Sequence, residues 1–304
     1  MFIEEYLQDL RRDRFALPAL LTYARRLAQR VRGDMVANPG AVRSVWSLAL
    51  LFFTAAFLAA VGLALAHDRH LAYAFFLATS LGIVPAFALV TFFIGELRDR
   101  DGYRLSALNV PIALTLLRIA LLPGVVMLLE QRHFLLAFSG YALAALSDVA
   151  DGWLARRWGQ VTTLGMVLDP IVDIVFNFAI LGGLWAARLL PGWVFAVAAT
   201  RYGVMLVGGA YLYIFVGPVR IQPTLFGRLT GVLMSALVML LVLLTVAPHA
   251  IADRLTPLTE IALGVLLSAT VAQVAALGWY NLRVMTGKVE SQGRVVGDVR
   301  WGAR

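Results

Sequence analysis

Four aspartates are spaced so that their carboxylates could act together. Asp148 and Asp151 are three residues apart, and Asp169 and Asp173 are four apart, so each pair projects from one face of a helix. A polar turn around Gln160 lies midway between the two pairs. Residues equidistant from an antiparallel turn stand at the same depth, so the inner pair Asp151–Asp169 and the outer pair Asp148–Asp173 are each matched. The sequence therefore predicts a cluster of four carboxylates on a helical hairpin.

Such a cluster calls for a divalent cation. Four like charges at close range in a low dielectric must take up protons or bind cations. Oxygen ligands without cysteine or nearby histidine favour Mg²⁺, Mn²⁺ or Ca²⁺ over zinc, and Mg²⁺ commonly shares its shell with substrate phosphates. The chain has no cysteine, and its histidines fall in the expected outer loops: His67, His70, His133 and His249. The alternative interpretation of the aspartates is a set of hydrogen-bonded helix caps.

The elements that carry these residues are expected to cross a membrane. Of 304 residues, 61% are hydrophobic and 14% charged, which excludes a disordered chain and exceeds what a soluble core needs. Runs of about 20 apolar residues match the thickness of a bilayer. We therefore expect an all-α integral membrane protein with about eight transmembrane helices, near residues 44–66, 71–95, 111–129, 134–155, 164–187, 192–216, 229–247 and 258–282.

The basic residues predict the orientation. Of the 26 lysines and arginines, 20 fall on one face of this topology and two within spans, while the outer loops hold one each: Arg69, Arg132, Arg188 and Arg254. Basic loops face the cytoplasm, so both termini are expected there. The net charge of +8 then reports orientation and contact with anionic lipids, and no nucleic acid is expected as a partner.

The two ends of the chain are expected to lie outside the membrane. Residues 1–43 lack an initial apolar run, which argues against a secretory signal or a transit peptide. Leu20, Ala24, Leu27 and Val31 recur at helical spacing among arginines, as in a helix at the membrane surface or a solvated one. Residues 44–107 hold two spans and a cytoplasmic linker, and residues 283–304 are expected to be a cytoplasmic tail.

The aspartate hairpin resembles the signature of the CDP-alcohol phosphotransferases. It reads Asp148-Val-Ala-Asp151-Gly152-Trp-Leu-Ala155-Arg156, then eight residues, Gly165, three residues, Asp169, three residues and Asp173. The resemblance covers residues 108–282, which would form the six-helix core of that family. The first two spans and the N-terminal segment lie outside it.

The resemblance implies transfer of a substituted phosphoryl group from a CDP-linked lipid, usually CDP-diacylglycerol, to an alcohol, with release of CMP. By position, Asp148, Asp151, Asp169 and Asp173 would be ligands of two Mg²⁺ or Mn²⁺ ions. Asp173 resembles the family's last aspartate, the proposed catalytic base for the acceptor hydroxyl. Two metals held by carboxylates can clamp a pyrophosphate and neutralise the leaving nucleotide.

The resemblance also implies nucleotide and acceptor contacts. Asp148, Gly152, Ala155, Arg156 and Gly165 would bind the nucleotide, since small side chains let it approach the backbone and arginine neutralises diphosphate. Ordinary packing of small residues between membrane helices is the alternative for the two glycines and the alanine.

Acceptor contacts are assigned to Thr115, Arg118, Arg201 and Arg228. An arginine within the hydrocarbon core of a membrane needs an anionic partner, which could be either a substrate or a site aspartate. The opening helix of the resemblance departs at one position, where Ile112 replaces the usual asparagine after proline. For Arg228, simple anchoring at the cytoplasmic face is the alternative.

These arginines favour a phosphorylated acceptor. Glycerol 3-phosphate is the leading candidate, and inositol phosphate and serine are alternatives. The expected setting is a bacterial inner membrane with the site facing the cytoplasm, and the protein could be a homodimer. Two rivals are an aspartate-rich prenyltransferase, whose motifs lie farther apart in sequence, and a divalent-cation transporter, whose permeating ion the nearby arginines would repel.

Overall fold

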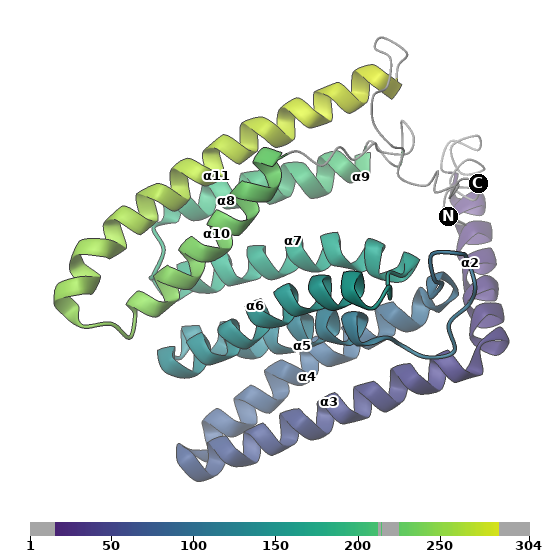
Figure 1. The fold of residues 1–304 in the computed structure, drawn as a ribbon, viewed down its shortest axis with the longest axis horizontal. Helices are drawn as coiled ribbons and strands as arrows, with labels where there is room; N and C mark the ends of the chain where they lie inside the picture. The colour runs from purple at the N-terminus through teal and green to yellow at the C-terminus, as the bar shows by residue number, and fades with distance from the viewer. Residues whose placement is uncertain (1–15, 212–213, 215–224, 286–304) are drawn as a thin grey trace. The chain divides into compact units, whose positions relative to one another are not determined.

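The computed structural model describes residues 16–211, 214 and 225–285. These residues form helices, with a 3₁₀ turn at Ile94–Glu96 and a π-helical turn at Val204–Gly208, and no β-strand occurs among them. Figure 1 shows the helices, whose bounds are α2 (Leu17–Ala37), α3 (Pro39–Ala66), α4 (Arg69–Phe92), α5 (Val110–Glu130), α6 (Phe134–Arg157), α7 (Thr163–Ala186), α8 (Gly192–Gly203), α9 (Gly209–Tyr211), α10 (Leu225–Leu244) and α11 (His249–Met285).

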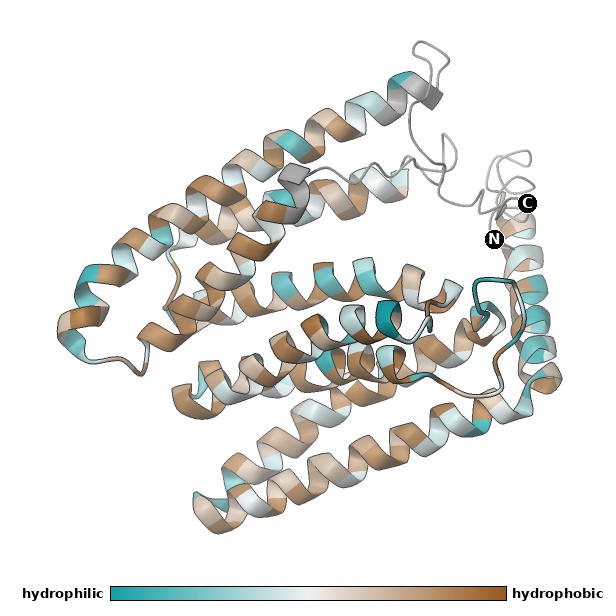
Figure 2. Ribbon diagram, viewed as in Figure 1, coloured by the Kyte–Doolittle hydropathy of each residue, from teal (hydrophilic) through white to brown (hydrophobic). Residues whose placement is uncertain are grey.

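The chain is an all-α membrane protein. Within the described ranges, seven helical stretches are long and apolar enough to cross a bilayer, and residues 229–244 form a shorter apolar one. The expected spans overlap these helices, but α3 begins at Pro39 and α11 at His249, several residues earlier than expected, and the end of the expected span 192–216 lies outside the described residues. Figure 2 shows hydrophobic residues along most of α3 and hydrophilic residues along α2, none of which is buried. The expected tail at 283–304 begins within α11, which continues to Met285; its remaining residues, 286–304, and residues 1–15 lie outside the described residues.

The chain divides into two compact units. The first contains Met1–Arg30, Gly192–Ala236 and Ile261–Arg304, and the second contains Val31–Pro191 and Leu237–Glu260. In the second unit α4 packs between α3 and α5, and α5 also contacts α6 and α7 (Figure 1). All four aspartates of the predicted cluster belong to this second unit.

Polar side chains set where the helices of this unit begin. The side chains of Asn38, Asp68, Asn109 and Thr162 accept a hydrogen bond from the backbone N–H three residues later, which caps α3, α4, α5 and α7. The bond from the N–H of Leu71 lowers the pKa of Asp68, because it stabilises the ionised carboxylate. The caps of α5 and α7 thereby fix where the two helices begin that carry Thr115, Arg118, Asp169 and Asp173.

Helix α5 is the buried centre of the second unit. Its buried residues run from Pro111 to Leu129 and include Thr115 and Arg118. On the side of α4, the backbones approach closely at Gly82: a Cβ atom there would lie 2.8 Å from the carbonyl oxygen of Ile119 and 2.9 Å from that of Ala120. Only glycine fits this contact, so Gly82 fixes the distance between α4 and α5.

We predict that Gly82→Ala destabilises the protein by about 1–3 kcal/mol, because the added methyl group forces α4 away from the α5 backbone. Thermal unfolding of the purified protein in detergent measures the effect. Gly62→Ala is the matched control, since no atom lies within 4 Å of the position where its Cβ would be and alanine is the better helix former. Equal melting temperatures for the two variants would contradict this account.

Candidate active site

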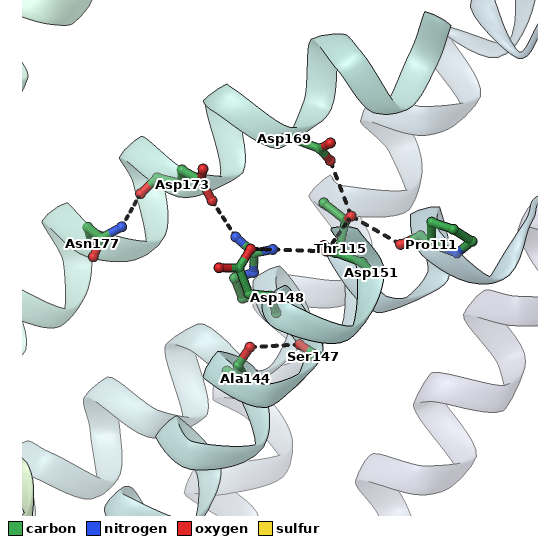
Figure 3. Close-up of polar contacts among 10 residues, drawn as sticks. Pro111, Thr115, Ala144, Ser147, Asp148, Asp151, Asp169, Asp173 and Asn177 are labelled. Atoms are coloured by element: carbon green, nitrogen blue, oxygen red, sulfur yellow. Dashed lines mark hydrogen bonds and ion pairs between the residues drawn. The ribbon is translucent and has the colours of Figure 1, made fainter. Parts of the chain in front are cut away.

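The polar site of the second unit lies where α5 faces the α6–α7 hairpin. Figure 3 shows Asp148 and Asp151 on one helix of the hairpin and Asp169 and Asp173 on the other. Helix α5 contributes Thr115, whose hydroxyl lies between the two helices of the hairpin. The structure therefore places the four predicted aspartates on two helices, α6 and α7, around polar side chains of a third, α5.

The turn of the hairpin is built to hold the two helices in register. Helix α6 ends with Gly159 in the left-handed conformation (φ +64°), and the N–H of Gln160 donates to the carbonyl of Ala155 at 3.0 Å. This is a Schellman end, which glycine forms without the strain other residues incur. Two residues later Thr162 caps α7 by accepting a hydrogen bond from the N–H of Gly165 at 3.0 Å. The short, doubly fixed connection sets the relative depth of the aspartates.

Thr115 joins the inner pair of aspartates. Its Oγ1 lies 3.1 Å from Oδ2 of Asp151 and 3.3 Å from Oδ1 of Asp169, and also 3.1 Å from the carbonyl oxygen of Pro111. A hydroxyl has one proton, so it can donate to only one of these three acceptors at a time. The inner pair therefore has more acceptor oxygens than this hydroxyl can satisfy.

Arg118 supplies positive charge to the cluster. Its guanidinium forms ion pairs with Asp148 and Asp173, and with Asp151 at 3.0 Å. The side chain of Arg118 is only 3% exposed, whereas those of Asp148 and Asp173 are 51% and 54% exposed. No ion pair of Asp169 occurs among the described residues. Arg118 thus pairs with the site aspartates, one of the two kinds of partner that its depth in the membrane predicted.

A cavity opens beside the inner pair. Asp151 and Asp169 line it together with Thr115 and with the small residues predicted to bind a nucleotide, Gly152, Ala155 and Gly165; the rest of its wall is Pro111, Ile112, Gln160, Val161, Thr162 and Met166. The guanidinium of Arg156 lies beside Gly152, 3.3 Å from where a Cβ atom would be. An anionic group beside Gly152 would lie close to this guanidinium, and the three small residues leave room for it in the cavity.

The aspartates have the right chemistry to hold divalent cations. They offer eight carboxylate oxygens, while the side-chain hydrogen bonds and ion pairs that reach them among the described residues come from one hydroxyl and one guanidinium. Excess hard oxygen donors suit Mg²⁺ or Mn²⁺. In the arrangement described, no three carboxylates or histidines of the described residues converge closely enough to form a metal site. The ligand roles of Asp148, Asp151, Asp169 and Asp173 remain a prediction.

The other predicted acceptor residues belong to the first unit. Arg201 ends α8, where its Nη1 lies 3.4 Å from the sulfur of Met234 and its guanidinium lies over the ring of Tyr202. No carboxylate partner of Arg201 occurs among the described residues. Arg228 lies in the first turns of α10, within the helix rather than in a loop before it. Their roles stay predictions.

Asn109 supports the site and was not among the predicted site residues. It caps α5 by accepting from the N–H of Ile112 at 3.2 Å, and its Nδ2 donates to the carbonyl of Gln160 at 2.7 Å. It therefore ties the start of α5 to the hairpin turn. Asparagine two residues before a proline is a sequence signal for a helix start, but nothing in the pattern indicates the second bond.

Comparisons with known proteins agree on one family. The profile described as CDP-alcohol phosphatidyltransferase matches residues 108–282. A probable CMP-forming cardiolipin synthase of Drosophila melanogaster is 29% identical over 162 residues, 47% of this chain and 49% of the relative. Proteins named CDP-diacylglycerol–glycerol-3-phosphate 3-phosphatidyltransferase are 33% identical over 147 residues in Pseudomonas fluorescens and 28% over 130 residues in Aquifex aeolicus.

The match to the Pseudomonas protein covers 44% of this chain and the match to the Aquifex protein covers 42%, and each match covers 72% of the relative. The match to the Drosophila protein thus spans about half of that relative's length. No solved structure shows significant similarity to the chain.

We predict that Asp169→Asn weakens Mn²⁺ binding at least tenfold, because it removes a formal charge and a coordinating oxygen from the cluster. Binding is measured by titrating the purified protein with Mn²⁺ in detergent. Asp34→Asn is the control, since Asp34 pairs with Arg104 outside the cluster. An unchanged affinity in Asp169→Asn would remove Asp169 from the metal site.

Proposed function

The chain belongs to the CDP-alcohol phosphatidyltransferase family, and from that premise we propose that it transfers a phosphatidyl group from CDP-diacylglycerol to glycerol 3-phosphate, releasing CMP. The observation that carries the proposal is the meeting of four aspartates, Thr115 and Arg118 beside a cavity to which Gly152, Ala155 and Gly165 contribute. This combination suits a diphosphate linkage, whose charge needs cations and whose nucleotide needs a close approach to the backbone.

The residues around the cavity would bind the donor. Gly152, Ala155 and Gly165 leave room for the nucleotide beside the inner aspartates, and Arg156 would pair with diphosphate oxygens. Asp148, Asp151, Asp169 and Asp173 would hold Mg²⁺ or Mn²⁺, taken as two ions from the family resemblance. When bound, such ions polarise the attacked phosphorus and neutralise the leaving nucleotide.

Asp173 is the proposed base for the acceptor. Its carboxylate belongs to the outer pair, is half exposed and is not among the described residues that line the cavity. An acceptor hydroxyl arriving from that side could give its proton to Asp173 while its oxygen attacks the phosphorus. The nucleotide and the acceptor would then approach the cluster from different sides.

The acceptor is the least constrained part of the proposal. Glycerol 3-phosphate is supported by the names of the Pseudomonas and Aquifex relatives and by the predicted arginines. Relatives named cardiolipin synthase favour a second candidate, phosphatidylglycerol. Inositol phosphate and serine remain alternatives from the sequence. A cation transporter would use the carboxylates but leave the wall of small residues without a role.

The proposed topology has eight spans, with α10 as the additional one and both termini in the cytoplasm. The basic residues support it, because Arg156 and Arg157 end α6 at the hairpin turn and most other arginines fall on the same side. The site would then open to the cytoplasmic face of the plasma membrane. A homodimer is compatible with this topology.

Purified protein supplied with CDP-diacylglycerol and Mg²⁺ tests the acceptor. Glycerol 3-phosphate, phosphatidylglycerol, inositol phosphate and serine are added separately, and CMP release and the new lipid are measured. The proposal expects glycerol 3-phosphate to yield phosphatidylglycerophosphate fastest. Cardiolipin as the main product would support the second candidate, and no CMP release with any acceptor would contradict the activity.

We predict that Asp173→Asn lowers kcat at least a hundredfold and changes the affinity for CDP-diacylglycerol by a much smaller factor. The reason is that a base acts in the transition state, and proton transfer contributes about 10²–10⁴-fold. Steady-state kinetics and equilibrium binding of CDP-diacylglycerol separate the two effects. A fall of both by the same factor would make Asp173 a metal ligand rather than the base.

We predict that Arg201→Ala raises the KM for glycerol 3-phosphate about tenfold or more, which corresponds to roughly 1.5–3 kcal/mol for a lost charge-assisted hydrogen bond. The KM for CDP-diacylglycerol should change little. Arg201→Lys should restore only part of the affinity, because lysine keeps the charge but not the bidentate geometry. A folded variant with an unchanged acceptor KM would exclude Arg201 from the acceptor site.

A further inference from the structure

Arg118 and the proposed metal ions need the same oxygens. The guanidinium pairs with Asp148, Asp151 and Asp173, three of the four proposed ligands. It comes from α5, outside the hairpin that carries the aspartates. We infer that Arg118 is an exchangeable internal counter-ion: divalent cations displace its guanidinium from these carboxylates, which frees it to pair with an anionic group of the substrate. This inference rests on the proposed function, because it takes the aspartates as metal ligands.

The two kinds of cation compete for electrostatic reasons. A carboxylate oxygen that accepts a charge-assisted hydrogen bond from a guanidinium has a lone pair engaged, and a divalent cation on the same oxygens would be repelled by the guanidinium at close range. Asp169 is the exception, because it has no ion pair among the described residues and shares only the proton of Thr115. Metal binding at Asp169 is therefore the least opposed, and Asp169 should be engaged first.

The contacts of Arg118 suit a side chain that changes partners. Its Nε is buried and has no hydrogen-bond partner among the described residues. A guanidinium fixed permanently in a buried site is expected to use all its donors. Two of its three partners, Asp148 and Asp173, have side chains that are about half exposed, so the surrounding protein does not enclose these carboxylates. A cation could therefore approach them without first moving another helix.

The charge of the site changes sign when the cations enter. Four ionised aspartates and Arg118 carry a formal charge of −3, which would repel a diphosphate. Two divalent cations bring the same group to +1, and the released guanidinium adds a directed donor for phosphate oxygens. Binding of metal would thus precede productive binding of the donor lipid, with Arg118 serving the aspartates before and the substrate afterwards.

Titration with Mn²⁺ alone tests the exchange. The protein in detergent, without any substrate, is compared with Arg118→Gln and Arg118→Met. If Arg118 competes with the metal, removing its charge should lower the Kd for Mn²⁺ about fivefold or more in both variants. Arg104→Gln is the matched control, because Arg104 pairs with Asp34 at 3.0 Å outside the cluster. Its Kd should stay within about twofold of the unmodified protein. An unchanged or higher Kd in a folded Arg118 variant overturns the inference.

Thermal unfolding gives a second readout that does not depend on Kd. Ligand that binds only the folded protein raises its melting temperature, and tighter binding raises it more. The rise between EDTA and a fixed Mn²⁺ concentration should be larger for Arg118→Gln than for the unmodified protein. An equal or smaller rise counts against exchange. Arg118→Gln keeps a hydrogen-bond donor, so it serves the test if Arg118→Met does not fold.

Asp169→Asn in the same titration separates this inference from the proposed function. If the unmodified protein binds no Mn²⁺, or Asp169→Asn binds it equally well, the metal site itself fails and the exchange falls with it. If Asp169→Asn binds weakly while the Arg118 variants bind no more tightly than the unmodified protein, the metal site stands and only the exchange is wrong.

Discussion

The structure depends on the need to compensate four carboxylates on helices that are otherwise apolar. Like charges repel strongly where the dielectric is low, and leaving any of them without a partner would destabilise the helical hairpin. Arg118 compensates the negative charge of Asp148, Asp151 and Asp173 through ion pairs, while the hydroxyl of Thr115 contacts Asp151 and Asp169. Both compensating residues lie on α5, three residues apart and on one face. The rest of the fold must therefore keep α5 in place against the α6–α7 hairpin.

That constraint gives the two helices before the family match a structural role. Helices α3 and α4 precede residue 108, where the match begins, yet α4 packs directly on α5. Gly82 sets the distance of that contact, and Ile83, Ala86 and Phe87 join Ile112 and Leu116 of α5 in one apolar core. Because α5 packs against α4 as well as against α6 and α7, it cannot slide along its axis. Thr115 and Arg118 therefore keep their depth relative to the aspartates.

The sequence predicted most of this site because helix periodicity and a short turn determine where the aspartates lie. It could not decide which anion Arg118 would meet, since a long side chain reaches several acceptors and spacing along α5 does not rank them. It also placed the start of the last span near Leu258, with Arg254 in an outer loop. The structure continues α11 back to His249, and a helix tolerates proline when its neighbours accommodate the lost bond.

The inner and outer aspartates differ in what surrounds them, and this difference suits a two-substrate reaction. Asp151 and Asp169 line the cavity with Gly152 and Gly165, whereas the part of the chain described here places neither outer carboxylate in its wall. Both outer carboxylates are bound by the guanidinium of Arg118, which among the described residues pairs with only Asp151 of the inner pair. If the nucleotide lies beside the inner pair and the alcohol beside the outer pair, the alcohol oxygen would attack the phosphorus from the side opposite the leaving nucleotide. In-line displacement requires this arrangement, because the attacking and leaving oxygens must stand on opposite faces of the phosphorus.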